Sequence, residues 1–411
     1  MVGEFMKIAT VLFTYNRSFH TQKVLDALKR NEVLPDKLFI FQDGLKKEEH
    51  REEWNRVKDI IRSVGWCDVE IIESEKNKGL AKAIVYGLNY VFNNNDAVIV
   101  LEDDCVTHPL FMKYMNGALR YYEKEEQVYS IGGYGWPVDV KPNGTDVYFT
   151  RRVSSWGWAT WKRKWTIYEE DYKILGRIKK DESLSKQLYF WGRDLENYIL
   201  GNIYGYCDSW ATFWALNVIM NEGYCVAPYY SLVDNIGMDG TGVHCGSFKE
   251  EIRMLDDKCK KEFKFCNDYH IEYQTELNFA EYFSWISREA RSECYYRIML
   301  KWMQLHLRKK TINTFLDKKD IRKICIWGKG EICNLLLQEL DENREILAII
   351  ESKPTLDEYQ GIEIRKANEI PEETQLIILI PEYDKEVILG KLSVIWKDKV
   401  LGISEILECT I

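Results

Sequence analysis

Short apolar runs alternate with longer stretches of helical periodicity from Lys7 onward, and this alternation limits the fold more than any other feature of the sequence. Four apolar runs are expected to be strands, at Ile8–Phe13, Lys37–Phe41, Val69–Ile72 and Ala97–Leu101. Three stretches between them are expected to be helices, at Thr21–Arg30, Glu48–Val64 and Leu80–Phe92. Such alternation is typical of βαβ units, and it predicts an α/β protein with a mostly parallel, Rossmann-like sheet.

A second alternation of the same kind begins near Lys323. Its expected elements are the strands Ile324–Trp327, Leu347–Ile350 and Leu376–Ile380 and the helix Glu331–Leu340. The turn Gly328-Lys329-Gly330 is an incomplete dinucleotide-binding fingerprint, because Cys333 stands at the place of the third glycine. Glu351 follows where a ribose-binding acid would be. A small Rossmann-like domain is therefore expected, with either a structural or a nucleotide-binding role.

Composition narrows the setting in which the chain works. Its 411 residues have a formal net charge of -9, which argues against nucleic acid as a partner. No window approaches the roughly 18 apolar residues of a spanning helix, and the N-terminus lacks a signal-peptide layout. Eleven cysteines without a Cys-x2-Cys pair favour free thiols in a reducing cytoplasm. The basic stretch 308–323 is either a solvated linker or a contact with anionic lipid at the inner face of the membrane.

Three carboxylates follow the apolar run Ala97–Leu101 directly, namely Glu102, Asp103 and Asp104. Side chains alternate along an extended chain, so Glu102 and Asp104 share one face while Asp103 points to the other. Clustered carboxylates repel one another unless a cation or hydrogen-bond donors neutralise them. Mn²⁺ or Mg²⁺ would do so and could also bridge to a diphosphate. The alternative is a solvated acidic turn.

Together with Thr14-Tyr15-Asn16-Arg17 after the first strand, this cluster makes residues 7–246 resemble a GT-A fold glycosyltransferase of the family 2 type. Glu102-Asp103-Asp104 is similar to the Asp-x-Asp (DXD) element of that family, in the Glu-Asp-Asp form of animal N-acetylglucosaminyltransferase I. The resemblance implies that Asp104 is a direct metal ligand with Glu102 beside it. It also implies that Asp103 faces the ribose or a metal-bound water.

The resemblance also implies a set of donor-binding residues at the ends of the strands. They are Thr14, Tyr15, Asn16, Arg17, Asp43, Asn77, Gly79, Lys82 and Asp103. Asp43 would accept a hydrogen bond from the nucleotide base, although Asp43-Gly44 is also compatible with a plain turn. The glycine loop before Leu80 offers N–H groups at a helix start, and its lysines are either phosphate contacts or a solvated helix face.

The acceptor half of the site is expected further along the chain. Asp208 is the candidate general base, with Asp194 as the alternative, and Asp208 is equally suited to cap a helix that begins near Trp210. Trp156, Gly157 and Trp158 occupy the place of the glycine loop of the family and would contact the sugar or the acceptor, unless the tryptophans belong to the core. His244, in a glycine-rich loop, would complete metal or diphosphate binding.

We therefore predict a bacterial, metal-dependent and inverting hexosyl- or N-acetylhexosaminyltransferase. It would move a sugar from a nucleoside-diphosphate-sugar, with UDP favoured, to a saccharide or lipid-linked saccharide in surface polysaccharide or glycoconjugate synthesis. The alternatives are a nucleotidyltransferase acting on sugar phosphates and a non-catalytic carbohydrate-binding or scaffold protein. Self-association and peripheral membrane contact stay open.

The predicted domain organisation has four segments. Residues 1–5 are expected to be an addition before a natural start at Met6, and residues 6–270 the GT-A domain. A helical and basic linker is expected at 271–320, followed by the Rossmann-like domain at 321–411.

Overall fold

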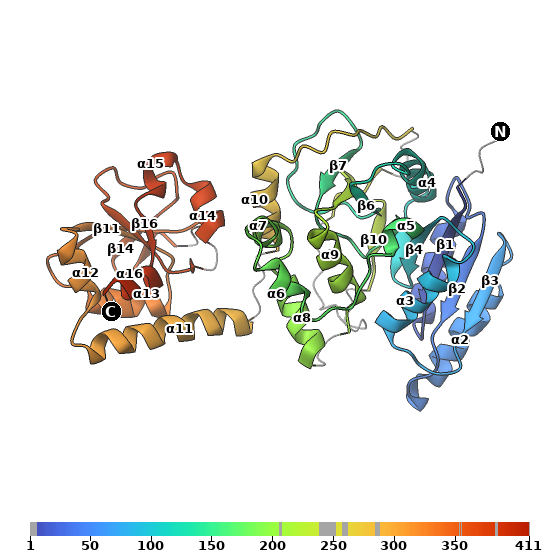
Figure 1. The fold of residues 1–411 in the computed structure, drawn as a ribbon, viewed down its shortest axis with the longest axis horizontal. Helices are drawn as coiled ribbons and strands as arrows, with labels where there is room; N and C mark the ends of the chain where they lie inside the picture. The colour runs from blue at the N-terminus through green and yellow to red at the C-terminus, as the bar shows by residue number, and fades with distance from the viewer. Residues whose placement is uncertain are drawn as a thin grey trace. The chain divides into compact units, whose positions relative to one another are not determined.

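The computed structural model describes residues 6–204, 208–237, 252–256, 262–283, 288–352, 354, 356–382 and 385–410 (Figure 1). The chain divides into two units, Met1–Phe283 and Ser284–Ile411. Each unit has a sheet and hydrophobic core of its own. Residues expected to lie in a linker thus fall partly in one unit and partly in the other.

An eight-stranded sheet forms the centre of the N-terminal unit, in the order β3-β2-β1-β4-β8-β6-β9-β7. Its strands are β1 (Ile8–Thr14), β2 (Leu38–Gln42), β3 (Val69–Glu73), β4 (Ala97–Glu102), β6 (Val128–Gly132), β7 (Val147–Thr150), β8 (Trp158–Trp161) and β9 (Tyr224–Pro228). Strands β1 to β4 pair in parallel, which confirms the predicted α/β fold with a mostly parallel sheet. β8 runs antiparallel between β4 and β6, and β7 runs antiparallel to β9.

Helices cover both faces of this sheet. They are α1 (Ser18–Lys29), α2 (Arg51–Arg62), α3 (Leu80–Val91), α4 (Phe111–Tyr121), α5 (Lys162–Trp165), α6 (Ile174–Ile178), α7 (Glu182–Trp191), α8 (Leu195–Tyr204), α9 (Trp210–Met220) and α10 (Tyr273–Tyr282). A short 3₁₀ helix, η1 (Glu48–His50), precedes α2. Alternate residues of β1 enter different cores: Leu12 packs with α1 and α2, whereas Val11 and Phe13 pack with α3 and α9. The central strands β1 and β2 are therefore buried along their whole length, as strands covered on both faces are.

A two-stranded ribbon brings a late segment of the chain back to the end of β4. β5 (Cys105–Thr107) pairs antiparallel with β10 (Val233–Asn235), so that Asn235 lies opposite Cys105. The backbone N–H of Ile236 donates to the carbonyl of Asp104 at 3.0 Å and continues this contact past the ribbon. The pairing places residues 233–237 directly against the acidic cluster.

The C-terminal unit has a six-stranded sheet in the order β13-β14-β12-β11-β15-β16, parallel except for β13. Its strands are β11 (Lys323–Trp327), β12 (Glu345–Ile350), β13 (Glu358–Tyr359), β14 (Ile362–Arg365), β15 (Leu376–Leu379) and β16 (Val400–Gly402). Its helices are α11 (Arg288–Leu307), α12 (Ile312–Lys318), α13 (Glu331–Glu339), α14 (Lys385–Lys391), α15 (Val394–Lys397) and α16 (Ile403–Thr410). None of the helices in the described part of the chain has the length and apolar character that crossing a membrane requires.

Helices α11 and α12 are built into this second unit. Trp302 of α11 and Phe315 of α12 are buried in the same core as the strand β11. Glu339, at the end of α13, accepts hydrogen bonds from the Trp302 indole at 2.5 Å and from the backbone N–H of Ile312 at 2.6 Å, and it contacts His306 Nε2 at 2.6 Å. One carboxylate thus joins three helices, and the segment behaves as part of the fold and not as a free connection.

Candidate active site

The acidic cluster lies where β1 and β4 end side by side. The two strands pair in parallel with Phe13 opposite Glu102, so residues that follow them meet at the same edge of the sheet. The side chains of Asp103 and Asp104 are buried. Arg17, just after β1, contacts Asp103 Oδ1 through its Nη2 atom, and the same nitrogen lies 2.8 Å from Asp104 Oδ2. One guanidinium therefore holds both aspartates.

Negative charge exceeds positive charge in this cluster. Burial, and then the neighbouring Asp104 and Asp103, raise the pKa of Glu102 to about 8. Burial also raises the pKa of Asp103, although Arg17 opposes this. Burial lowers the pKa of Arg17, but the two aspartates raise it overall, so the guanidinium stays charged. Asp103 and Asp104 alone carry more negative charge than Arg17 neutralises, and a bound cation would also favour the deprotonated form of Glu102.

Asn235 and Gly237 complete this side of the site, and neither was among the residues predicted from the sequence. Asn235 Nδ2 lies 3.4 Å from Asp104 Oδ1, and Asn235 Oδ1 accepts a hydrogen bond from the Gly237 N–H at 2.8 Å. A Cβ atom at position 237 would lie 2.3 Å from Asp104 Oδ2 and 3.1 Å from Arg17 Nη1. Only glycine fits so close to the carboxylate. The prediction from this segment was His244, which lies outside the described residues.

The oxygen atoms of this cluster suit a hard divalent cation that is bound partly by the protein and partly by the phosphate groups of a ligand. Within the described residues, no group of three or more His, Cys, Asp and Glu side chains is arranged to hold a metal ion. Mg²⁺ and similar ions usually bind through only one or two carboxylates, and phosphate oxygens and waters complete the shell. Asp104 and Asp103 can supply those carboxylates. The site therefore suits an ion that arrives with a diphosphate and not one held in a protein cage.

Asp43 organises a loop on the neighbouring strand end. Its Oδ1 accepts hydrogen bonds from the N–H groups of Gly44 at 2.8 Å and Lys78 at 2.9 Å, and its Oδ2 accepts from Asn77 Nδ2 at 2.9 Å and the Gly79 N–H at 3.0 Å. These contacts fix the loop before α3, and Gly79 has a positive φ of 79° at the helix start. Asp43 thus has a structural role beyond the base contact that the resemblance implies.

Asp208 comes to the same loop from a distant part of the chain. Its Oδ2 lies 3.1 Å from the position that a Cβ of Gly79 would take, and the residue is exposed. The cap of α9 is Ser209 and not Asp208, since the Ser209 hydroxyl accepts from the Thr212 N–H at 3.4 Å. The helix is therefore capped by Ser209 and not by Asp208. The carboxylate of Asp208 lies beside a loop that is predicted to bind the donor.

Asp194, the alternative base, is engaged in a partly buried ion pair. Both of its oxygens contact the guanidinium of Arg152, at 2.8 and 2.6 Å. Such a bidentate pair fixes the carboxylate in one orientation. The ion pair of Arg152 and Asp194 is thus a second arginine–aspartate contact, and it is separate from the cluster around Asp104.

The remaining predicted donor residues lie around the ends of β1 and β2. Thr14 Oγ1 donates to the carbonyl of Phe41 at 3.2 Å. The hydroxyl of Tyr15 accepts from the Lys46 N–H at 2.9 Å and forms a hydrogen bond with His50 Nδ1 at 2.9 Å. Asn16 is half-buried, and Lys82 is exposed in the first turn of α3.

The two tryptophans predicted to face a sugar have different surroundings. Trp158 is fully buried in β8 and stacks on Trp210 with a centroid distance of 5.0 Å. The expectation that it contacts a sugar does not fit this position, because a core indole has no free face. Trp156 is only partly buried and packs edge-on against Tyr134 at 4.6 Å. Gly157 has a positive φ of 59°, and a Cβ there would lie 2.6 Å from a Val233 methyl group.

A parallel α/β sheet with charged residues at the carboxyl ends of its strands is an arrangement typical of nucleotide-binding enzymes. Residues 10–177 match the family model described as glycosyl transferase family 2. This part of the N-terminal unit is thus similar to family 2 glycosyl transferases, which confirms the resemblance found from the motifs. The search among curated proteins gives no match.

Three of the solved structures to which the chain is similar are the following. A mannosyltransferase of Pyrobaculum calidifontis, in complex with GDP-Man and Mn²⁺, is 10% identical, with 53% of this chain and 74% of that chain covered and a TM-score of 0.29. TarS 1–349 of S. aureus is 11% identical, with coverages of 57% and 62% and a TM-score of 0.33. Glucosyl-3-phosphoglycerate synthase of Mycobacterium tuberculosis is 16% identical, with coverages of 38% and 57% and a TM-score of 0.26. The match thus spans less than two thirds of the last two proteins.

Proposed function

We propose that the N-terminal unit is a metal-dependent, inverting glycosyltransferase that uses a nucleoside-diphosphate-sugar, with a UDP-sugar favoured. The observation that carries this proposal is the buried pair Asp103 and Asp104 at the end of β4, held by Arg17 from the end of β1. Mn²⁺ or Mg²⁺ would act there as a Lewis acid on the leaving diphosphate. Asp104 would ligate the ion with Asp103 and Glu102 beside it, and His244 is proposed to complete the site.

The donor would lie across the ends of β1, β2 and β4. Asp43 already accepts the N–H groups of Lys78 and Gly79. The part of the loop that can meet a diphosphate is therefore the first turn of α3 with Lys82. Arg17 and Asn16 approach the same region from β1, and Arg17 can exchange a carboxylate for a phosphate oxygen because both are anionic acceptors.

We propose Asp208 as the general base, with Asp194 as the alternative. A base must deprotonate the acceptor hydroxyl on the side of the sugar opposite the leaving diphosphate. Asp208 stands against Gly79 at the donor loop and is released from capping by Ser209. Asp194 is tied to Arg152 by two short contacts, which makes it the weaker candidate. Trp156 and Gly157 are proposed to shape the acceptor pocket.

The acceptor is proposed to be a saccharide or lipid-linked saccharide in the synthesis of a bacterial surface polysaccharide or glycoconjugate. The enzyme would act in the cytoplasm, at the inner face of the membrane where such acceptors are presented. All candidate residues within the described ranges precede Phe283. We therefore propose that the N-terminal unit holds the whole catalytic domain.

A thermal-shift screen of UDP-, GDP-, dTDP- and CDP-sugars, with and without Mn²⁺, tests this function. We expect one nucleotide class to stabilise the protein only when Mn²⁺ is present, and slow release of the nucleoside diphosphate with that donor. NMR of the product with a simple saccharide acceptor would establish inversion at the anomeric carbon. Formation of a nucleotide sugar from a nucleoside triphosphate and a sugar phosphate would instead identify a nucleotidyltransferase. Absence of Mn²⁺-dependent binding to every donor would favour a non-catalytic protein.

A further inference from the structure

Helix α11 carries an apolar stripe on its solvent side. Tyr296, Leu300, Met303 and Leu307 expose between 39% and 82% of their area, although all are large and apolar. Their spacing of four, three and four residues places them on one face of the helix. The opposite face, with Trp302 among others, is packed in the core of the C-terminal unit. The helix is thus apolar on two faces, and only one of them is used by the fold.

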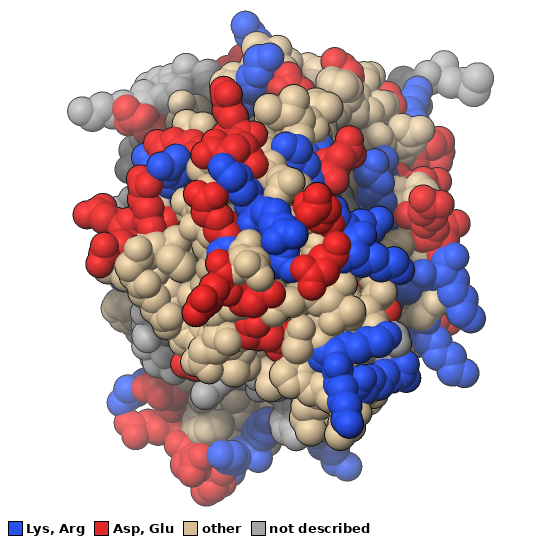
Figure 2. All heavy atoms as spheres, turned by 90° about the vertical axis from the view of Figure 1, so that its left-hand side faces the viewer, with Lys and Arg blue, Asp and Glu red and all other residues tan. Residues whose placement is uncertain are grey.

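Positive charge gathers along the same segment of a chain that is acidic overall. Residues 288–323 contain eleven Lys and Arg but four Asp and Glu, an excess of seven positive charges, whereas the whole chain has a net charge of -9. Arg308, Lys309 and Lys310 follow the last residue of the stripe directly. Some of these groups have partners; for example, Lys310 Nζ donates to the carbonyl of Thr410 at 2.8 Å. A carbonyl carries no net charge, so this contact does not reduce the excess of positive charge. Figure 2 shows Lys and Arg side chains gathered at the lower right of the face it presents, among mostly uncharged atoms.

We propose that the α11 face, defined as the stripe Tyr296, Leu300, Met303 and Leu307 with the basic run 308–310, docks on an anionic membrane surface. Helices that lie in a membrane interface combine an apolar face with Lys and Arg beside it, which is the combination found here. Clusters of basic residues next to such a face add attraction to anionic headgroups. The face has the required apolar side chains, the required sign of charge and a rigid attachment to the folded unit.

A second copy of the chain fits this face less well. Two α11 faces brought together around a twofold axis would place two positively charged segments against each other. Four side chains on one helix also offer less area than a stable interface buries. An anionic lipid surface meets both conditions, because it neutralises the charge and accepts a narrow apolar stripe.

Sedimentation of the full chain with vesicles tests the proposal. We expect co-sedimentation with vesicles of equal parts phosphatidylglycerol and phosphatidylcholine, little with phosphatidylcholine alone, and weakening of the first as salt rises. Met303→Gln combined with Leu307→Gln should lower the apparent affinity by at least about tenfold, because two side chains that would enter the interface lose their apolar character. Glutamine keeps helix propensity, so circular dichroism should not change. Arg308→Gln with Lys309→Gln should reduce binding and flatten its salt dependence.

Val394→Gln with Ile395→Gln is the matched control, since these residues are just as exposed but lie on α15, outside the basic segment. This pair should bind vesicles like the wild type. The proposal is overturned if the wild type ignores anionic vesicles, binds neutral ones equally well, or loses affinity equally with the control pair. A dimer in analytical ultracentrifugation that Leu307→Gln dissociates would assign the face to self-association instead. No donor, metal or acceptor enters the assay, so its failure and a failure of the proposed transfer reaction are distinguishable.

Discussion

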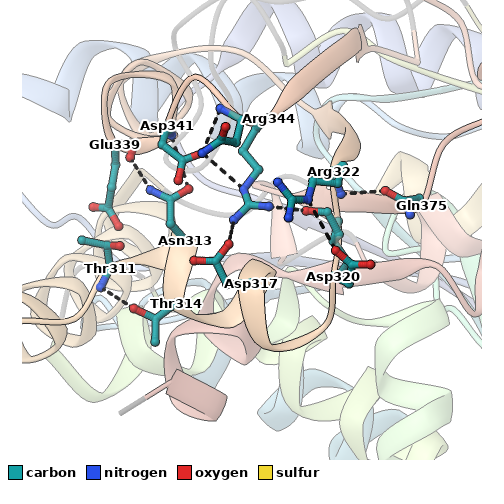
Figure 3. A network of polar contacts seen from close by, with 12 residues as sticks. Thr311, Asn313, Thr314, Asp317, Asp320, Arg322, Glu339, Asp341, Arg344 and Gln375 are labelled. Atoms are coloured by element: carbon teal, nitrogen blue, oxygen red, sulfur yellow. Dashed lines mark hydrogen bonds and ion pairs between the residues drawn. The ribbon is translucent and has the colours of Figure 1, made fainter.

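Two clusters of one arginine and two aspartates, one in each unit, have opposite exposure to solvent. In the N-terminal unit the side chains of Asp103 and Asp104 are 8% and 10% exposed and that of Arg17 is 19% exposed. In the C-terminal unit the side chain of Arg344 is fully buried, while those of Asp317 and Asp341 are 62% and 38% exposed (Figure 3). The first cluster buries its acids, and the second buries its base.

The difference is the one expected between a binding site, as proposed for the first cluster, and a structural contact. Arg344 Nη1 also donates to the carbonyl of Ile321 at 2.6 Å, so the buried cation has three partners, and water screens the acids. Asp317 and Asp341 keep their contact with water, so their negative charge is stabilised there without a further ion. At the end of β4 the acids are shielded from water, and Glu102 adds a third carboxylate to the same cluster. Buried negative charge is costly in the absence of a ligand, and this supports the proposal that the first cluster binds one.

The largest expected effect follows from Asp104→Asn. Turnover should fall by at least about a thousandfold, because the ion proposed to stabilise the leaving diphosphate would lose its main ligand. The melting temperature should stay the same or rise, because one repulsive charge is removed. Asp317→Asn, which alters an exposed aspartate of the other cluster, should leave turnover unchanged. Normal activity of Asp104→Asn in a steady-state assay would refute the assignment of the metal site.

Arg344→Met should act on stability alone. It removes a fully buried cation with its ion pairs to Asp317 and Asp341, and we expect a loss of about 2 to 3 kcal/mol in the C-terminal unit. This loss is smaller than the one expected when a partner of a fully buried ion pair is removed. Asp317 and Asp341, which remain, are in contact with water and are not left as buried unpaired charges. Hydrogen exchange of α12 and β12 would measure it within that unit. Arg322→Met, whose arginine and partner Asp320 are both exposed, is the control and should cost about 0.5 kcal/mol or less.

Asp208→Asn is expected to lower kcat by at least about a hundredfold with little change in donor affinity. As the proposed base, Asp208 would face the acceptor hydroxyl and not the diphosphate, which would separate the two effects. Ser209→Ala should show the complementary result, a stability loss of about 1 kcal/mol with kcat nearly intact, because Ser209 caps α9. If Asp208→Asn retains its kcat, Asp208 is not the base, and the same measurement on Asp194→Asn tests the alternative base.

Local patterns predicted the elements that frame the site. The apolar run expected at 97–101 is β4 (Ala97–Glu102), and the glycine loop leads into α3 at Leu80 as expected. These features depend on residues close in sequence, namely strand periodicity and a glycine before a helix. The position of the three carboxylates at a strand end could be predicted for the same reason.

Long-range pairing could not be predicted in this way. The antiparallel strand β8 between β4 and β6 puts Trp158 in the core, and nothing in the local pattern distinguishes it from Trp156. The pairing of β10 with β5 brings Asn235 and Gly237 to Asp104 across more than a hundred residues. Asp208 and Ser209 are both suitable caps by sequence, and only the backbone geometry distinguishes them.

Arg17 distinguishes the two clusters most directly. If its guanidinium occupies the carboxylates that a metal ion would use, Arg17→Gln should raise the affinity for Mn²⁺ without nucleotide by about three- to tenfold, because a competing cation is gone. Affinity for the donor in the presence of Mn²⁺ should fall, because a proposed phosphate contact is lost. Electron paramagnetic resonance of free Mn²⁺ and calorimetry with the donor would measure the two effects separately. Lys29→Gln, at the far end of α1, removes the same charge and should change neither. Weaker Mn²⁺ binding by Arg17→Gln would show instead that the arginine positions Asp103 and Asp104 for the ion, which would make its role closer to that of Arg344.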